Sequence, residues 1–284
     1  MYPEYPFTSH YIKVNGHSLH YIDEGKGPAV MMIHGNPTWS YYYRNLIHQF
    51  CSSHRVIVPD HMGCGLSAKP EPYNYCLQQH IDNLEQLLVH TGIDAFSLVV
   101  HDWGGAIGFG LAARHVERVE KIVVLNTAAF RSTRIPLRIR LCRMPVLGEI
   151  IVRFFNGFAG SAVKMAAVKK VDSAIASAYI SPYNSWKNRV AIYNFVKDIP
   201  LESHHRSYRV LVEIEKQLPL IRAAKIPIKI IWGGKDFCFD DMFYREWVNR
   251  FPEAQCHYFP DAGHYVLEDK KDEIAELLNE FFRG

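Results

Sequence analysis

Short apolar runs alternate with longer helical patterns through the first half of the chain. The apolar runs cover residues 29–34, 55–59, 98–101 and 121–126. Each run is rich in Val, Ile, Leu or Met and is bounded by turn-forming residues, which predicts strands buried on both faces. The helical patterns cover residues 41–50, 77–90 and 105–115. Strands and helices in this order predict a parallel sheet with helices on both of its faces.

The alternation stops after Asn126 and resumes near residue 228. The later elements are strands at 228–232 and 255–259 and helices at 241–250 and 271–282. The intervening stretch has apolar positions at mixed helical spacing and many Arg and Lys side chains. A parallel sheet interrupted by a helical block predicts one fold that carries an insertion. We therefore expect a core made of residues 1–126 and 221–284, with a helical cap inserted at residues 127–220.

The composition is that of an ordinary globular protein, and it excludes several classes. The chain has 284 residues, of which 48% are hydrophobic and 21% are charged, with a net charge of +3. These values exclude a disordered or coiled-coil chain and give no reason to expect a nucleic-acid partner. No apolar run is long enough to span a membrane, and the N-terminus lacks the pattern of a signal peptide. The six scattered cysteines have no metal-binding spacing and predict free thiols in a cytoplasmic protein.

The strongest chemical signal lies around Asp102. An apolar run leads through His101 into Asp102 and then directly into Trp103, Gly104 and Gly105. This is the strand–turn–helix context of a nucleophile elbow, where small residues make room for a strained turn. A carboxylate in that position attacks without prior deprotonation and forms a covalent ester. The alternative is that Asp102 only caps the following helix.

Two further residues follow in the chain order expected of such a site. Asp236 comes just after one predicted strand of the second half, and His264 comes just after the next. Nucleophile, acid and His in this order predict a catalytic triad of Asp102, Asp236 and His264. No carboxylate follows the strand that ends at Asn126, so Asp236 is the only good candidate for the acid. Taken singly, Asp236 could form a turn and His264 could stabilise a loop, but the agreement of all three positions favours the triad.

Two neutral hydrogen-bond donors belong to the same predicted site. Asn36 lies in the loop after the first long apolar strand, and Trp103 follows the nucleophile. In this arrangement their backbone N–H groups are placed to form an oxyanion hole. Their side chains are donors that cannot act as bases, which suits a leaving group that departs as an anion. We expect His34 and His101 to stabilise their loops rather than to react.

Five segments carry a resemblance to the haloalkane dehalogenase branch of the α/β-hydrolases. They are HGNPTWSYYYR at 34–44, PDHMGCGLS at 59–67, HDWGG at 101–105, GKDF at 234–237 and DAGHY at 261–265. The donor pair Asn36 and Trp103, with the acid at Asp236, is similar to the third subfamily of that branch. The cap segment 181–200 and residues 236–239 resemble its OleB-type β-lactone decarboxylases. The resemblance implies an α/β-hydrolase fold with a mostly parallel sheet, an inserted helical cap and an ester intermediate on the elbow carboxylate.

The same resemblance implies a hydrophobic β-lactone as substrate, decarboxylated to an alkene, and other enzymes of hydrocarbon synthesis as partners. Haloalkane hydrolysis shares the chemistry, so a true haloalkane dehalogenase is the first alternative. An epoxide hydrolase is a further alternative, but Asn36 argues against it because that family usually carries an aromatic residue there. A ligand-binding module without activity is the alternative from a different class. A serine esterase is excluded because Asp102 stands where the serine is needed.

The sequence contains no cofactor-binding motif and no metal-ligand pattern. We therefore expect no cofactor and no metal, and full activity in the presence of a chelator. The basic run at residues 131–143 is interpreted as a solvated face of the cap. Docking of that run on an acidic membrane or on a partner enzyme is the alternative.

Overall fold

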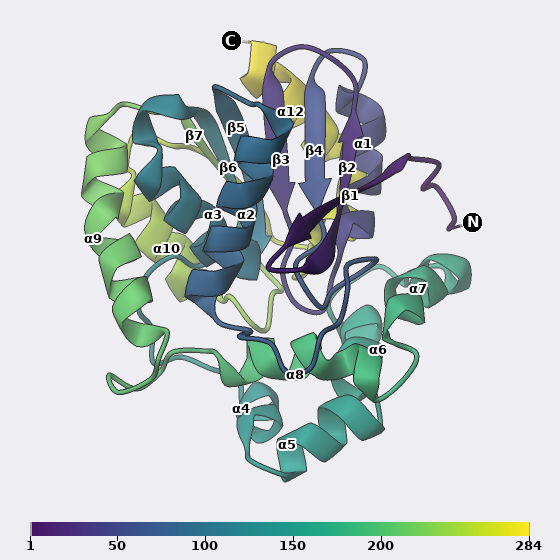
Figure 1. Ribbon diagram of the computed structural model, residues 1–284. Coiled ribbons are helices and arrows are strands. Elements are labelled where there is room, and N and C mark those ends of the chain that lie inside the picture. The colour runs from purple at the N-terminus through teal and green to yellow at the C-terminus, as the bar shows by residue number, and fades with distance from the viewer. Residues whose placement is uncertain (1, 284) are drawn as a thin grey trace.

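Eight strands form one sheet in the computed structural model, which describes residues 2–283. The strands are β1 Ser9–Val14, β2 His17–Glu24, β3 Ala29–Ile33, β4 Arg55–Pro59, β5 Phe96–Asp102, β6 Val119–Thr127, β7 Ile228–Gly233 and β8 Gln255–Phe259. Their order in the sheet is β1-β2-β4-β3-β5-β6-β7-β8 (Figure 1). The pairs β1–β2 and β2–β4 are antiparallel, and the other neighbouring pairs are parallel. The expected mostly parallel sheet is confirmed.

The six apolar runs of the sequence are the strands from β3 to β8. The bounds of β4 and β8 agree with the expected ones, and the other four differ by a few residues at their ends. The prediction omits β1 and β2, because polar and apolar side chains are mixed in both strands. In β2, for example, the polar His17 and His20 lie on either side of Leu19. β1 forms an edge of the sheet, where most of its side chains are not buried. An antiparallel edge strand with one solvent-exposed face needs no continuous apolar run.

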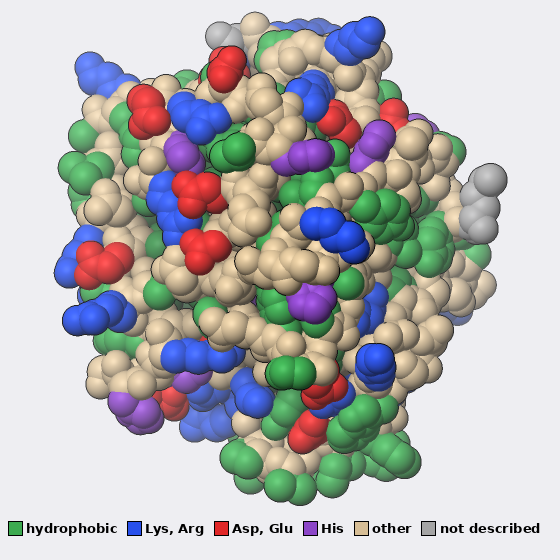
Figure 2. All heavy atoms as spheres, in the orientation of Figure 1, with side chains coloured by type: hydrophobic (Ala, Val, Ile, Leu, Met, Phe, Trp, Pro, Cys, Tyr) green, Lys and Arg blue, Asp and Glu red, His purple; other side chains and the backbone are tan. Residues whose placement is uncertain are grey.

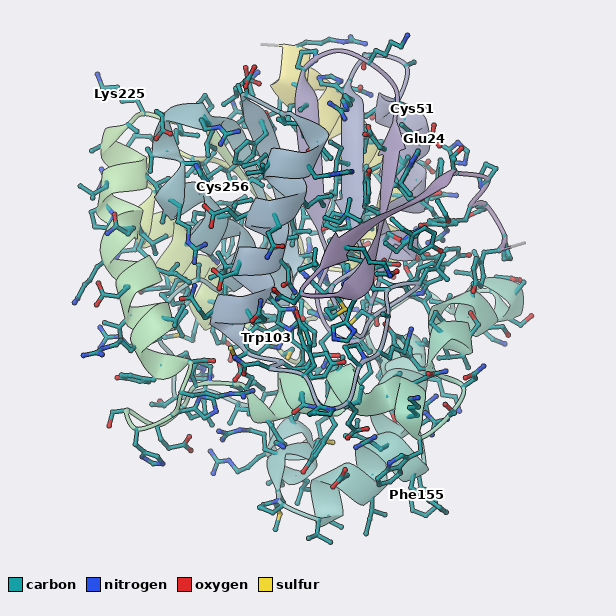
Figure 3. The ribbon with its side chains drawn as sticks, in the orientation of Figure 1. Glu24, Cys51, Trp103, Phe155, Lys225 and Cys256 are labelled. Carbon is teal, nitrogen blue, oxygen red and sulfur yellow. The ribbon has the colours of Figure 1, made fainter. Side chains whose placement is uncertain are left out.

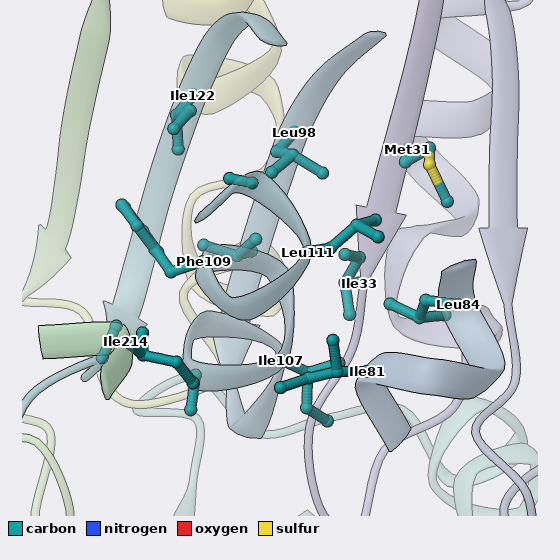
Figure 4. Packing of buried hydrophobic residues seen from close by; sticks show 14 of the residues in the cluster. Met31, Ile33, Ile81, Leu84, Leu98, Ile107, Phe109, Leu111, Ile122 and Ile214 are labelled. Carbon is teal, nitrogen blue, oxygen red and sulfur yellow. The ribbon is translucent and has the colours of Figure 1, made fainter. Parts of the chain in front are cut away.

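Alternate side chains of the central strands enter two separate cores. In β3, Met31 and Ile33 pack into the core on one face of the sheet, and Val30 and Met32 pack into the core on the other. Successive side chains of a strand point to opposite faces, so a strand covered on both faces must be apolar throughout. Figure 4 shows Met31 and Ile33 in the first core, beside Leu84 and other residues of the helices that cover it.

Helices cover both faces of this sheet (Figure 1). The helices are α1 Arg44–Phe50, α2 Leu77–Thr91, α3 Trp103–Arg114, α4 Leu137–Arg143, α5 Leu147–Glu149, α6 Gly157–Met165, α7 Ser173–Ile180, α8 Val190–Lys197, α9 Tyr208–Ala223, α10 Asp241–Arg250, α11 Val266–Asp269 and α12 Lys271–Arg283. Short 3-10 turns lie at Ser40–Tyr43, Val116–Arg118, Ser181–Tyr183 and Lys187–Arg189, and Ile150–Phe154 is a π-helical turn. α2, α3, α9 and α10 contribute to the first core, and α1 and α12 to the second.

Every regular element that the structure describes between β6 and β7 is helical. Of these helices, α4 to α8 lie together at the end of the molecule toward which the parallel strands run (Figure 1). α9 instead packs against α2 and α3 beside the sheet. The division into core and cap at residues 127 and 220 stays a prediction, to which the structure adds the position of α9. Within residues 2–283, no helix combines the length and the apolar character that crossing a membrane requires.

Candidate active site

Asp102 lies at the turn between β5 and α3, in a strained backbone conformation. Its φ of 51° and ψ of −127° are unusual for a residue with a side chain. Neighbouring glycines make room for the turn. A Cβ atom at Gly35 would collide with the Asp102 side chain, and a Cβ atom at Gly105 would collide with Thr127. The turn places the carboxylate of Asp102 at the carboxyl end of a buried strand.

The structure brings Asp102, Asp236 and His264 together. Asp236 follows β7 and His264 follows β8, so the carboxyl ends of three parallel strands converge on one place. Nδ1 of His264 lies 2.7 Å from Oδ2 of Asp236. Nε2 of His264 lies 3.6 Å from Oδ2 of Asp102, beyond direct hydrogen-bond distance. All three residues are buried.

Asp236 is held by donors from three other residues. Its Oδ1 accepts hydrogen bonds from the backbone N–H groups of Cys238, at 2.6 Å, and Phe239, at 3.0 Å. Its Oδ2 accepts one from Nδ2 of Asn126 at 3.0 Å. Asn126 is fully buried at the end of β6, and it also bonds both backbone polar groups of Gly233. The sequence analysis gave Asn126 no role. The sequence does show it as a polar residue at the carboxyl end of an apolar strand, and this position could have indicated a place in the site.

The His264 ring is enclosed by aromatic side chains. Phe239 stacks on it with the ring centres 5.8 Å apart, and the His101 ring lies 4.5 Å away. Nε2 of His101 donates a hydrogen bond to the backbone oxygen of His264 at 2.8 Å, because a carbonyl can only accept. His101 therefore positions the loop that carries His264. His34 instead bonds the backbone of Gly35 and His61, within its own region.

The predicted donors Asn36 and Trp103 both lie at this site. The backbone N–H of Asn36 donates to Oδ1 of Asp102 at 2.7 Å. The side-chain amide of Asn36 donates to the backbone oxygen of Ile192 at 3.3 Å. An amide nitrogen carries two N–H donors, so one remains for a ligand. The Trp103 ring packs beside Phe195 of α8, where the core meets the cap (Figure 3).

Burial and charge shift the pKa values of the nucleophile and the base. Burial raises the pKa of Asp102 because its carboxylate loses solvation, and the nearby His264 and backbone N–H groups oppose this rise. Burial alone lowers the pKa of His264, but the carboxylates of Asp236 and Asp102 outweigh it, so the pKa is raised overall. A desolvated carboxylate is a reactive nucleophile, and a His whose charged form is stabilised is a stronger base.

An apolar cavity of about 390 Å³ opens from these residues toward the cap. Asn36, Asp102, Trp103 and His264 lie along it, and most of the remaining lining comes from aliphatic and aromatic side chains of the cap. A cavity of this size and lining suits one apolar ligand with a few polar groups at one end. Among residues 2–283, no three His, Cys, Asp or Glu side chains are grouped in a way that could hold a metal ion.

Residues 28–271 match the alpha/beta hydrolase fold family. A cis-3-alkyl-4-alkyloxetan-2-one decarboxylase of Shewanella oneidensis is 45% identical to this chain over 97% of its length and 88% of the relative. A decarboxylase of the same name from Xanthomonas campestris pv. campestris is 40% identical over 99% of the chain and 97% of the relative. An oxetan-2-one is a β-lactone, the four-membered ring that the resemblance in sequence implied.

Solved structures agree with the fold. The crystal structure of haloalkane dehalogenase DbeA from Bradyrhizobium elkani superimposes with a TM-score of 0.90 at 24% identity, covering 98% of both chains. This likeness concerns the fold, since the identity is low. The match of residues 28–271 and the two decarboxylases, aligned over nearly the whole chain, identify the family. The chain belongs to the α/β-hydrolase fold family, in the group that contains these β-lactone decarboxylases.

Proposed function

We propose that this protein decarboxylates a cis-3,4-dialkyl β-lactone to an alkene, with Asp102 as the nucleophile. The observation that carries the proposal is the buried carboxylate of Asp102 at one end of an apolar cavity, with a donor on one oxygen and His264 near the other. The two relatives at 45% and 40% identity, both named for this reaction, support the choice of substrate.

In the proposed reaction, Asp102 opens the strained ring and forms an ester with the substrate. Negative charge develops on the oxygen that leaves, and the N–H donors of Asn36 and Trp103 stabilise it. The bond to the carboxyl carbon then breaks and releases CO2, and its electron pair forms the carbon–carbon double bond. The ester C–O bond breaks at the same time, and its electron pair returns to the Asp102 carboxylate. The atoms of the lactone are all recovered in alkene and CO2, so this reaction consumes no water.

Haloalkane hydrolysis is the second candidate, and the neutral donor pair favours it. Asp102 would displace the halide in line, and the side chains of Asn36 and Trp103 would stabilise the departing anion. His264, oriented by Asp236, would then activate water against the ester carbonyl. Water is a reactant in this pathway, which distinguishes it from the lactone reaction.

The observed cavity argues against an epoxide hydrolase. Such an enzyme needs tyrosines that protonate the epoxide oxygen, yet the described residues that line the cavity include no tyrosine. The hydroxyl groups of Tyr179 and Tyr183 bond Glu268 and the backbone of Gly65 instead. A ligand-binding module needs none of the strained geometry at Asp102. We also propose a cytoplasmic location and other enzymes of hydrocarbon synthesis as partners, on the basis of the free thiols and the resemblance.

The test gives the purified protein a long-chain cis-β-lactone and, in parallel, a bromoalkane of similar length. Fast alkene formation with slow halide release supports the proposed decarboxylase. Fast halide release with unchanged lactone would make the protein a haloalkane dehalogenase. The Asp102→Ala variant should lose both activities, whereas Asp272→Ala, a change at an exposed carboxylate of α12, should keep them. An active Asp102→Ala variant would contradict the mechanism.

A further inference from the structure

An apolar surface lies at the outer end of the cap. We define the cap apolar surface by Leu137, Met144, Val146, Leu147, Phe154 and Phe155, which are between 44% and 72% exposed. These residues come from α4, α5, the π-helical turn and the segments beside them. Figure 2 shows apolar side chains gathered at the lower end of the molecule, and Figure 3 places Phe155 there.

The concentration of these side chains is unusual for a surface. Of the fifteen large apolar side chains that are exposed among residues 2–283, eleven lie between positions 137 and 186. Isolated apolar residues are normal on a protein surface, but a contiguous patch marks a site of interaction. Val146 adds a second sign, because this β-branched residue has a φ of 61°, in a region that favours glycine. A strained backbone therefore holds an apolar side chain toward solvent.

The cap also carries a strong positive charge. Residues 127–220 contain 15 Lys and Arg against 6 Asp and Glu, a net charge of +9, while the rest of the chain has 17 against 23, a net charge of −6. Arg140, Arg143, Lys197 and His204 line a shallow groove next to Met144. Arg143 pairs with Glu202, but Arg140 has no ion-pair partner among residues 2–283. This difference in net charge between the cap and the rest of the chain favours an approach to a negatively charged surface with the cap first.

The cap apolar surface and the active-site cavity share structural elements. Ile139, Leu141 and Cys142 of α4 and Ile151 of the π-helical turn line the cavity, whereas Leu137 and Phe154 of the same elements face outward. The cap wall of the cavity is therefore also the wall that carries the exposed surface. An apolar molecule held at this surface would be separated from the cavity by one layer of helices.

We propose that the cap apolar surface docks on a lipid bilayer that contains anionic headgroups. The exposed apolar side chains enter the boundary between headgroups and acyl chains, and Arg140 and Arg143 lie at the level of the phosphates. A second copy of this chain is a poor occupant, because a symmetric contact would bring two caps of net charge +9 together. Docking depends on no particular reaction, so the inference stands apart from the proposed function.

The test is sedimentation of the purified protein with vesicles, without substrate. One set of vesicles is phosphatidylcholine alone, and the other contains phosphatidylglycerol as well. The wild-type protein should partition onto the anionic vesicles, and binding should weaken as salt is added. The Phe154→Ser/Phe155→Ser variant should bind about tenfold or more weakly, because two aromatic anchors are lost. Val89→Ser, a change at a side chain that is 74% exposed on α2, is the matched control and should bind like the wild type.

Several results would overturn the inference. They are absence of binding by the wild-type protein, equal binding to both kinds of vesicle, and unchanged binding by the double variant. Analytical ultracentrifugation tests whether a second copy of the chain binds this surface instead. A wild-type dimer that is absent in the double variant would make the surface an interface between copies and would overturn the inference. Turnover of a short, water-soluble substrate by the double variant should equal that of the wild type, since neither phenylalanine lines the cavity. Equal turnover shows that a loss of vesicle binding is not caused by misfolding.

Discussion

Oδ2 of Asp236 accepts a hydrogen bond from Nδ2 of Asn126 at 3.0 Å and lies 2.7 Å from Nδ1 of His264. One carboxylate oxygen thus joins the base to an amide on the neighbouring strand. Because the amide also bonds the backbone of Gly233, it fixes the position of Asp236 relative to the end of β7. Asn126 is therefore a positioning residue that acts through Asp236.

Replacing Asn126 with Ala should lower kcat/KM by about tenfold to a hundredfold, the cost of a buried hydrogen bond to a charged group. The steady-state kinetics of bromoalkane hydrolysis, in which His264 activates water, measure this loss. Asn188→Ala, which removes an exposed amide bonded to Asn184 in the cap, is the control and should have little effect. Unchanged kinetics in Asn126→Ala would show that Asp236 needs no support from this side.

The carboxylate of Asp236 should be the main cause of the raised pKa of His264. The pKa of the buried His264 is raised above its ordinary value of 6.5 because Asp236, and then Asp102, stabilise the imidazolium. In Asp236→Asn this support is lost, burial dominates, and the pKa should fall below that of the wild type. NMR titration of the His264 ring measures both values. A higher pKa in the variant would contradict the electrostatic account of the base.

The same shift gives a pH dependence of stability with a defined sign. A His whose pKa is raised by folding stabilises the protein below its unfolded pKa, near 6.5, and loses this contribution as the pH rises through the folded pKa. The Tm difference between wild type and His264→Phe should therefore shrink as the pH rises. A difference that grows toward alkaline pH would contradict the prediction.

Asp102→Asn should be almost inactive yet more stable than the wild type near neutral pH. The pKa of Asp102 is raised by burial, so its ionised form costs free energy of folding above its folded pKa, and this cost vanishes below its ordinary pKa of 3.8. An amide of the same shape has no such cost, but it is a poor nucleophile, and activity should fall about a thousandfold or more. Thermal unfolding near pH 8 and again near pH 4 checks the sign, since the gain in Tm should be smaller at the lower pH.

The ion pair of Arg44 and Glu268 should carry much of the stability of the region between α1 and α11. Arg44 is buried and bonds both oxygens of Glu268, at 2.6 and 2.9 Å. Glu268→Ala removes both of these bonds and leaves the buried guanidinium only the half-exposed Glu4, at 3.0 Å, so it should cost about 3 kcal/mol of unfolding free energy. Glu253→Ala breaks the exposed pair with Arg222 and should cost far less, because solvent screens both charges. Equal losses in chemical denaturation would contradict this assignment.

The sequence was sufficient to predict six of the eight strands, β3 to β8, and the residues that meet at the carboxyl ends of these strands. Asp102, Asp236 and His264 each follow an apolar run, and the carboxyl ends of parallel strands converge, so their proximity follows from local pattern and topology. Asn36 and Trp103 were predictable for the same reason. Trp103 directly follows the end of β5, and Asn36 lies just after the end of β3.

The supporting contacts were not predictable, because they depend on distant parts of the chain. Asn126 bonds Asp236, which is 110 positions away, and His101 bonds the backbone of His264, which is 163 positions away. The local sequence around Asn126 or His101 does not indicate which distant residue it contacts. The cap presents a similar difficulty, since a helical pattern does not say which side chains line the cavity and which, like Phe155, face outward.

The formation of an ester on Asp102 is the central claim, and mass spectrometry tests it most directly. His264→Phe, which lacks the base that activates water, is mixed with a bromoalkane and digested. The account predicts that the peptide containing Asp102 gains the mass of the alkyl group, while the same peptide from Asp102→Ala/His264→Phe stays unmodified. Halide release without any alkylated Asp102 peptide, or alkylation at another residue, would contradict it.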